Sequence, residues 1–355
     1  GDPAVAEDSG WLFATNTTLG ADNGIGVATA LALLDMPASE KLPPLECLFT
    51  VDEETGLTGA FELDGSMVSG RTMLNLDTEE FGKIYMGCAG GGDSLIRMPK
   101  DMEEMQTIVT DDDQSGMVIM EFALSGLMGG HSGVNIHEYR GNGVVLGCRV
   151  LKALLVDDGV RLHSLHGGDQ HNAIPRELFA KVLVDSDRIS HCEKIVASSL
   201  AAIQREFGTK EPGLQCVLTP APSGTAESMA VMSHDRALKL LQMISLLPNG
   251  PSKYSHQVAG LVETSSNVAS IKWCPDDDRV QISCSTRSFM SEPLEEVRGQ
   301  IATLAGLCGA TSEKDSAYPG WAPRADSELL AIARESVKDV LGGEEPDILA
   351  IHAGL

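Results

Sequence analysis

Four carboxylate side chains stand in turns beside apolar segments, and together they could hold a divalent cation. They are Asp22, the adjacent pair Glu53 and Glu54, and Asp77. Carboxylates that converge repel one another unless protons or a cation neutralise them, and a divalent metal is the simplest neutralising group. Spacing alone leaves a second interpretation open, because most acidic side chains are simply solvated at the surface.

The types of these side chains define the chemistry further. Oxygen ligands together with histidine suit zinc, and a pair of metal ions needs a carboxylate that bridges them. Asp22 precedes a helix and two glycines, so backbone could pass close to such ions. Adjacent side chains cannot both take the same direction from a strand, so one of Glu53 and Glu54 could bind metal while the other handles a proton.

Short apolar runs predict the elements that position these acids. Residues 45–51 and 72–76 each end at an acidic turn, a pattern typical of buried strands in a parallel sheet. Small and apolar residues from Asn23 to Met36 predict a helix closed by Pro37. Strands that alternate with helices indicate an α/β fold with a mostly parallel sheet. In such sheets ligands bind outside the carboxyl ends of the strands, where these acids would meet.

Three further side chains could contact a substrate. His131 lies in a glycine-flanked run and could donate a hydrogen bond to an oxyanion. Arg287 could bind a carboxylate through its planar guanidinium group. Each also has an ordinary interpretation: His131 as a solvated loop residue, Arg287 as the partner of a nearby acid, and Asn172 as a turn residue before a proline.

After residue 91 the pattern changes to alternating strands and amphipathic helices, which predicts an inserted α+β domain. We therefore expect a catalytic domain formed by residues 1–90 and 317–355, and a lid or dimerisation domain formed by residues 91–316. The predicted strands lie near 94–98, 117–124, 177–184, 214–218, 259–272, 279–287 and 347–351. The predicted helices lie near 57–64, 143–155, 190–207, 226–247, 293 onward and 327–341.

Composition excludes several classes of function. The net charge of −25 disfavours nucleic-acid and anionic-membrane partners. No run reaches the roughly 18 apolar residues that a membrane span needs. The eight cysteines show no C-x-x-C spacing, and the N-terminus carries no secretion signal, so we expect a cytoplasmic protein. A phosphate-binding P-loop and a G-x-S-x-G serine elbow are both missing from the sequence.

Eight segments, in consistent order along the chain, resemble the aminoacyl-histidine dipeptidases (peptidase D, or bacterial carnosinase type), which belong to the dinuclear zinc peptidases. The segments are TTLGADNGIGVA (17–28), DEETGLTGAF (52–61), NLDTEEFGKIYMGCAGG (75–91), GGHSGVNIH (129–137), HNAIPRE (171–177), GLVETSSNVA (260–269), AYPGW (317–321) and IHAGL (351–355).

The resemblance implies roles for the four carboxylates. Asp22 would bridge two Zn²⁺ ions per subunit, while Glu54 would bind one ion and Asp77 the other. Glu53 would be the general base that deprotonates the bridging water. The family commonly holds the peptide bond between Asp22 and Asn23 in the cis form. Mn²⁺ or Co²⁺ could replace zinc at oxygen-rich sites.

The resemblance also implies substrate contacts. His131 would reach the substrate carbonyl or oxyanion, often in the partner subunit's site. Asn172, Arg287 and Gly354 match substrate-binding positions, with Arg287 holding the dipeptide carboxylate. The implied protein is a homodimer associated through its lid domain.

The expected function is metal-dependent hydrolysis of Xaa-His dipeptides such as β-alanyl-histidine, by a metal-bridged hydroxide with a Glu general base. The family's two histidine ligands would lie before residue 1 and after residue 355. We therefore expect the chain to be a fragment with little activity of its own. The alternatives are another exopeptidase or aminoacylase of the superfamily (a tripeptidase or carboxypeptidase), or a non-catalytic homologue whose fold serves dimerisation or ligand binding.

Overall fold

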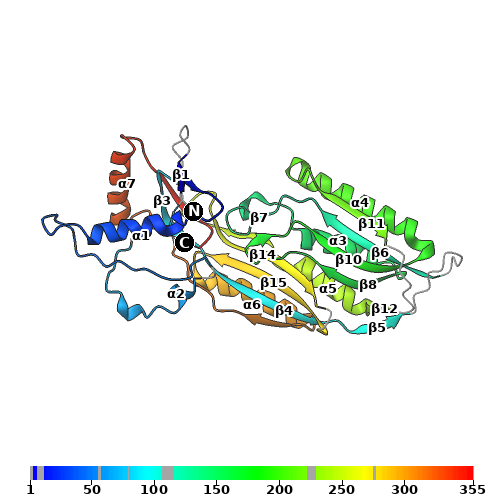
Figure 1. Ribbon diagram of the computed structural model, residues 1–355. Helices are drawn as coiled ribbons and strands as arrows, with labels where there is room; N and C mark the ends of the chain where they lie inside the picture. The colour runs from blue at the N-terminus through cyan, green and yellow to red at the C-terminus, as the bar shows by residue number, and fades with distance from the viewer. Residues whose placement is uncertain are drawn as a thin grey trace. The chain divides into compact units, whose positions relative to one another are not determined.

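The computed structural model of the protein describes residues 3–5, 12–54, 57–78, 80–105, 116–221, 229–274 and 277–354. The chain divides into two compact units. The first unit contains residues 1–84 and 325–349, and the second contains residues 85–324 and 350–354. Helices and sheets are both present, which confirms the predicted α/β class (Figure 1). The assignment of catalytic and lid roles to domains of the chain stays a prediction.

The first unit is built mainly from helices and turns. Its helices are α1 (Ala21–Leu34), α2 (Thr58–Phe61) and α7 (Glu328–Val340), with a 3₁₀ turn, η1, at Gly65–Met67. Strand β1 (Pro3–Val5) pairs antiparallel with β2 (Leu12–Ala14). Strands β3 (Lys83–Cys88) and β17 (Asp347–Ile351) pair with each other and continue into the second unit.

The two strands predicted beside the acidic turns are not formed, which corrects the sequence interpretation. Residues 45–50 and 72–78 have no regular structure, and neither segment pairs with a strand among the described residues. Their apolar side chains are largely exposed, at 67% for Val51, 67% for Met73 and 68% for Leu74. An extended segment becomes a strand only when a neighbour satisfies its backbone hydrogen bonds. These two segments therefore form no parallel sheet in the described part of the chain.

One layer of the second unit is a four-stranded antiparallel sheet. Its order is β11 (Gln215–Pro220), β6 (Met117–Ser125), β10 (Leu178–Asp185) and β8 (Val160–His166). Helix α3 (Gly143–Leu155) packs across this sheet, with α4 (Ile189–Phe207) and α5 (His234–Leu246) on either side of it (Figure 1). Burial alternates along β6, so one face of the sheet contributes to the apolar core.

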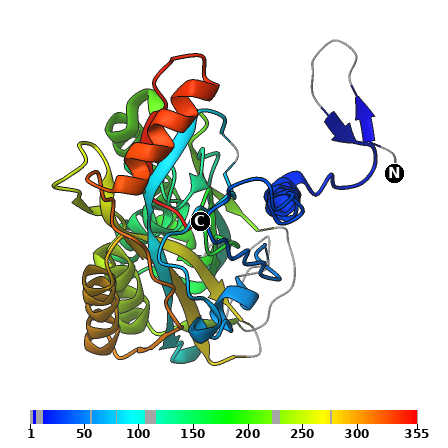
Figure 2. The ribbon, with the colours of Figure 1, turned by 90° about the vertical axis from the view of Figure 1, so that its left-hand side faces the viewer.

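The other layer is a five-stranded antiparallel sheet. Its order is β13 (Gly250–Tyr254), β14 (Val262–Trp273), β15 (Arg279–Ser288), β4 (Gly90–Pro99) and β16 (Thr311–Lys314). Helix α6 (Ser291–Leu307) packs against this sheet and lies beside α5 (Figure 2). A bridge between Gly167 and Ile271 joins the two sheets. Two short pairs complete the unit: β5 (Met102–Met105) with β12 (Met229–Met232), and β7 (Gly130–His131) with β9 (Ala173–Ile174).

The helix predicted over 226–247 is shorter than expected. Helix α5 begins at His234, and residues 229–232 form strand β12 instead, while 226–228 lie outside the described residues. Ser233 has extended backbone angles (φ −53°, ψ 142°) and separates the two elements. Pairing with β5 buries Val231 and Met232, so tertiary contacts override the helical spacing of the apolar residues.

The glycine-rich start of β4 lets two backbones come together. A Cβ atom at Gly90 would collide with the backbone of Gly320, and β4 also bridges to Tyr318 through Gly91. The run from Gly87 to Gly92 therefore serves close packing of strand β4 against the segment 318–320.

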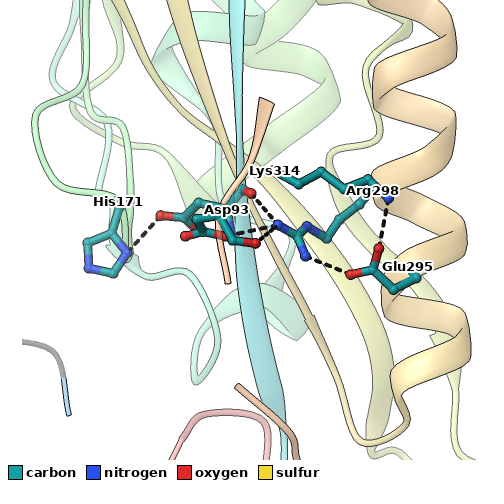
Figure 3. Close-up of polar contacts among 6 residues, drawn as sticks. Asp93, His171, Glu295, Arg298 and Lys314 are labelled. Carbon is teal, nitrogen blue, oxygen red and sulfur yellow. Dashed lines mark hydrogen bonds and ion pairs between the residues drawn. The ribbon is translucent and has the colours of Figure 1, made fainter. Parts of the chain in front are cut away.

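A buried arginine holds the same strand to helix α6. The side chain of Arg298 is 2% exposed, and it donates to the backbone oxygens of Asp93 (2.8 Å) and Asp315 (2.7 Å). It also pairs with the carboxylates of Asp315 (2.9 Å) and Glu295 (2.6 Å), as Figure 3 shows in part. A buried charge is tolerated when hydrogen bonds and partners of opposite charge surround it.

Arg298→Leu should lower the free energy of unfolding by about 3 kcal/mol, because it removes the donors that satisfy two backbone carbonyls and two carboxylates. Urea unfolding of the purified protein measures this. Arg149→Leu is the matched control, since Arg149 and Glu206 form an ion pair with both side chains about half exposed. The control should lose less than about 1 kcal/mol. Equal losses in the two variants would contradict the structural role of Arg298.

A second buried polar residue lies near the C-terminal end of the described chain. His352 is 6% exposed, and its Nε2 lies 2.8 Å from Oγ of Ser265 on β14. Burial and the neighbouring charge of Arg287 lower the pKa of His352 to about 3. The folded protein therefore keeps this imidazole neutral at pH values where an unfolded chain would protonate it.

This difference predicts a pH dependence of stability. Between pH 6.5 and about 3 the unfolded chain binds a proton that the folded chain does not, so stability falls as the pH falls through this window. The contribution reaches at most about 1.4 kcal/mol per pH unit. The free energy of unfolding should be measured at pH 7.5, 6.5 and 4.5. In His352→Gln the loss of stability between pH 6.5 and 4.5 should be smaller than in the unmodified protein, with pH 7.5 as the reference. An unchanged slope would refute the assignment.

Candidate active site

The four predicted carboxylates come together in the first unit. The pKa of Asp77 is raised to about 6 by burial, then by its interaction with Asp22 and by the charges of Glu53 and Glu54. Burial, followed by the charges of Glu54 and Asp22, also raises the pKa of Glu53. Asp77 is half-buried and the other three are exposed. Negative charge is therefore concentrated at one place.

Turns, rather than strand ends, position these acids. Asp22 lies in the first turn of α1, where its own backbone angles and those of Asn23 are not helical. The peptide bond between Asp22 and Asn23 is cis, as the resemblance implies. The backbone N–H of Asp77 donates to Oδ1 of Asn75 (2.8 Å), and the carbonyl of Glu53 accepts from Leu57 (3.0 Å).

The chemistry of this donor set fits a divalent cation. All four groups are carboxylates, and the first unit contains no histidine. The raised pKa of Asp77, caused first by burial and then by its interaction with Asp22, is the response expected of crowded carboxylates, whose repulsion a proton or a cation relieves. Among the described residues no group of three or more His, Cys, Asp or Glu side chains is already arranged to hold a metal ion.

His131 lies in the second unit and presents a hydrogen-bond donor. Its Nδ1 accepts from the backbone N–H groups of Gly133 (3.1 Å) and Val134 (2.9 Å). An atom that accepts from two donors carries no proton, so the neutral ring is protonated at Nε2. Burial and the positive charges of Arg287 and His171 lower the pKa of His131 to about 4. At neutral pH the ring is thus a neutral Nε2–H donor.

The loop that carries His131 is held by side chains. Oδ1 of Asn135 accepts from the backbone N–H of His131 (2.9 Å). Glu211, 4% exposed, accepts from the backbone N–H groups of Met128 (2.8 Å) and Gly141 (2.7 Å), on both sides of the loop. A buried carboxylate that binds two backbone donors fixes the loop without a salt bridge.

Arg287 is available for an anionic ligand. Its side chain is 6% exposed and donates through Nη1 to the hydroxyl of Tyr318 (2.9 Å). Its buried Nε has no hydrogen-bond partner among the described residues. A Cβ added to Gly133 would lie 3.1 Å from both Cδ of Arg287 and Cε1 of His131, so these two side chains flank Gly133.

Asn172 and Gly354 join the same group of residues. The carbonyl of Asn172 accepts from the N–H of Ser132 (2.8 Å), next to the pairing of Ala173 with His131. A Cβ added to Gly354 would lie 3.2 Å from the ring of Tyr318. The second unit therefore brings together four predicted residues: His131, Asn172, Arg287 and Gly354.

Sequence reasoning missed three residues of this group: Tyr318, His171 and Asp93. Tyr318 binds Arg287, and Nδ1 of His171 lies 3.3 Å from Oδ2 of Asp93. Tyr318 and His171 do fall within the segments AYPGW and HNAIPRE, which could have drawn attention to them. Asp93 carries no such signal.

Comparison with known proteins gives the family. No protein-family model matches the chain. The cytosol non-specific dipeptidase of Escherichia coli (strain K12) is 37% identical over 350 residues, which cover 98% of this chain and 68% of that protein. The crystal structure of aminoacylhistidine dipeptidase from Vibrio alginolyticus matches with a TM-score of 0.84 and 35% identity, over 99% of this chain and 68% of that one. The chain belongs to the family of these dipeptidases.

Proposed function

We propose that the protein is a metal-dependent dipeptidase that hydrolyses Xaa-His dipeptides such as β-alanyl-histidine. The observation that carries the proposal is the meeting of Asp22, Glu53, Glu54 and Asp77 in a chain of the dipeptidase family. The names of the two relatives support peptide hydrolysis, and that of the Vibrio protein supports the preference for histidine.

Three of these carboxylates would hold two Zn²⁺ ions per subunit. Asp22 would bridge the ions, Glu54 would bind one and Asp77 the other. When bound, the cations would polarise the scissile carbonyl and make a water molecule more acidic. Mn²⁺ or Co²⁺ could serve in place of zinc, because the donors are all oxygen atoms.

Glu53 is the proposed general base. It accepts a proton from the attacking water, whose oxygen forms the new bond to the scissile carbonyl carbon. As the carbon–nitrogen bond breaks, Glu53 returns that proton to the nitrogen of the leaving amine. The neighbouring charges of Glu54 and Asp22 favour proton uptake by this carboxylate.

The second unit supplies the groups that bind the substrate. His131 donates through Nε2–H to the carbonyl oxygen as negative charge develops there. Arg287, oriented by the hydroxyl of Tyr318, binds the carboxylate of the C-terminal residue. Asn172 and Gly354, beside these two groups, contact the bound dipeptide.

We further propose a cytoplasmic homodimer that associates through the lid domain, with neither nucleic acid nor membrane as a partner. The printed name of the Escherichia coli relative and the eight free cysteines support this compartment. None of the helices formed by the described residues has both the length and the apolar character that a bilayer crossing requires.

Hydrolysis assays of the complete protein that contains this chain, purified and loaded with zinc, test the function. β-Alanyl-histidine should be cleaved with a higher kcat/KM than tripeptides and N-acyl amino acids. Dialysis against a chelator should abolish the activity, and added Zn²⁺, Mn²⁺ or Co²⁺ should restore it. Preference for tripeptides or N-acyl amino acids would point to another member of the superfamily. Binding without any hydrolysis would point to a non-catalytic homologue.

The role of Glu53 predicts a separation of catalysis from metal binding. Glu53→Gln should lower kcat about 10²–10⁴-fold, because the amide accepts no proton from water. Zinc content, measured by atomic emission, should stay that of the unmodified protein. Glu62→Gln, at an exposed acid in the same unit, is the control and should change neither quantity. Full activity of Glu53→Gln would exclude Glu53 as the base.

A further inference from the structure

Two imidazoles in the second unit have opposite hydrogen-bonding capacities. His131 receives two backbone donors at Nδ1, so its Nε2 carries the proton and is a donor. Nδ1 of His171 instead faces a carboxylate, 3.3 Å from Oδ2 of Asp93. A carboxylate only accepts, so this contact is favourable when Nδ1 of His171 carries the proton. The Nε2 atom of neutral His171 is then a lone-pair acceptor.

Asp93 is held in place by contacts that do not use its side chain. Its backbone N–H donates to Oδ1 of Asp315 (2.7 Å), and its carbonyl accepts from the buried Arg298 (2.8 Å). Figure 3 shows the result: the Asp93 carboxylate is directed towards His171, on the side away from Arg298. The ring of His171 is therefore oriented by a carboxylate whose backbone is fixed.

His171 lies beside the groups that we assign to substrate binding. It directly precedes Asn172, whose carbonyl binds the loop of His131. Both His171 and Arg287 lie near enough to His131 to contribute to its lowered pKa, after the effect of burial. The side chain is 65% exposed, so its outer nitrogen is open to a ligand. An exposed ion pair contributes only about 0.2–1 kcal/mol to stability, so stabilisation of the fold is a weak explanation for this contact.

We propose that His171 is a specificity-determining residue whose Nε2 accepts a hydrogen bond from the imidazole N–H of a C-terminal histidine in the substrate. Asp93 is then a positioning residue that fixes the tautomer of His171. The inference rests on the proposed dipeptidase function. Arg287, in the same group of residues, would bind the carboxylate of that C-terminal residue. A leucine at the same place has no side-chain donor and gains nothing from His171.

Kinetics with two dipeptides test the inference. His171→Phe keeps a planar ring but removes the acceptor. Its kcat/KM should fall about tenfold for β-alanyl-histidine and change less than about twofold for β-alanyl-leucine. His171→Gln keeps an acceptor oxygen near the position of Nε2 and should recover part of the preference. If His171 had only a structural role, kcat/KM would fall equally for both substrates, and His171→Phe and His171→Gln would behave alike.

Two further variants define the contact. Asp93→Ala leaves both backbone hydrogen bonds of residue 93 possible but frees the ring of His171. It should therefore lower the specificity ratio, which is kcat/KM for β-alanyl-histidine divided by kcat/KM for β-alanyl-leucine. His191→Phe is the matched control, because His191 is 57% exposed and lies 3.8 Å from the carboxylate of Asp157 on a different part of the unit. This control should leave the ratio unchanged.

The outcomes separate this inference from the proposed function. If the complete protein that contains this chain cleaves neither dipeptide, the proposed function fails. If it cleaves β-alanyl-histidine and His171→Phe keeps the unmodified ratio, the function stands and the role of His171 is overturned. A wild-type ratio in Asp93→Ala, with a lowered ratio in His171→Phe, would remove only the positioning role of Asp93.

Discussion

Repulsion among four carboxylates is the constraint on which the chemistry of this protein depends. Asp22, Glu53, Glu54 and Asp77 lie close enough that their charges raise the pKa of Asp77 and of Glu53. Protein surfaces normally separate like charges, because their proximity costs stability. A cation could neutralise such a group, and all four side chains offer oxygen donors. In the proposed function, metal binding and proton transfer would both depend on this concentration of charge.

The second unit contributes complementary chemistry through rigid support. His131 is neutral because burial and nearby positive charge disfavour its protonation, and two backbone donors determine which nitrogen carries its proton. Arg287 donates to the hydroxyl of Tyr318, and its buried Nε has no partner among the described residues, which leaves it free for an anion. Buried Arg298 and Glu211 hold the strands and loops that present these groups. Preorganised donors of this kind favour a developing oxyanion without reorganisation during the reaction.

Much of this organisation could be predicted from the sequence, where local pattern and tertiary structure agree. The helix predicted over 143–155 and the strand predicted over 347–351 have the bounds of α3 and β17. In α3 the spacing of the apolar residues matches the face that the helix buries. The strands predicted over 45–51 and 72–76 are wrong, since an apolar run reveals nothing about whether a neighbour will pair with it. The four carboxylates could be proposed from the sequence because acidic turns and a family resemblance are local signals, and their roles stay predictions. The contact of Asp93 with His171 joins residues 78 positions apart, counted as 171 − 93, and only the folded chain shows it.

The claim that the four carboxylates form a metal site is tested most directly by anomalous X-ray diffraction at the zinc edge, on crystals of the protein grown with zinc. Our interpretation predicts two anomalous peaks, both within about 2.2 Å of carboxylate oxygens of Asp22, with Glu54 bound to one ion and Asp77 to the other. Zinc found only at sites remote from Asp22, Glu54 and Asp77, with these carboxylates left protonated or paired with other side chains, would contradict it.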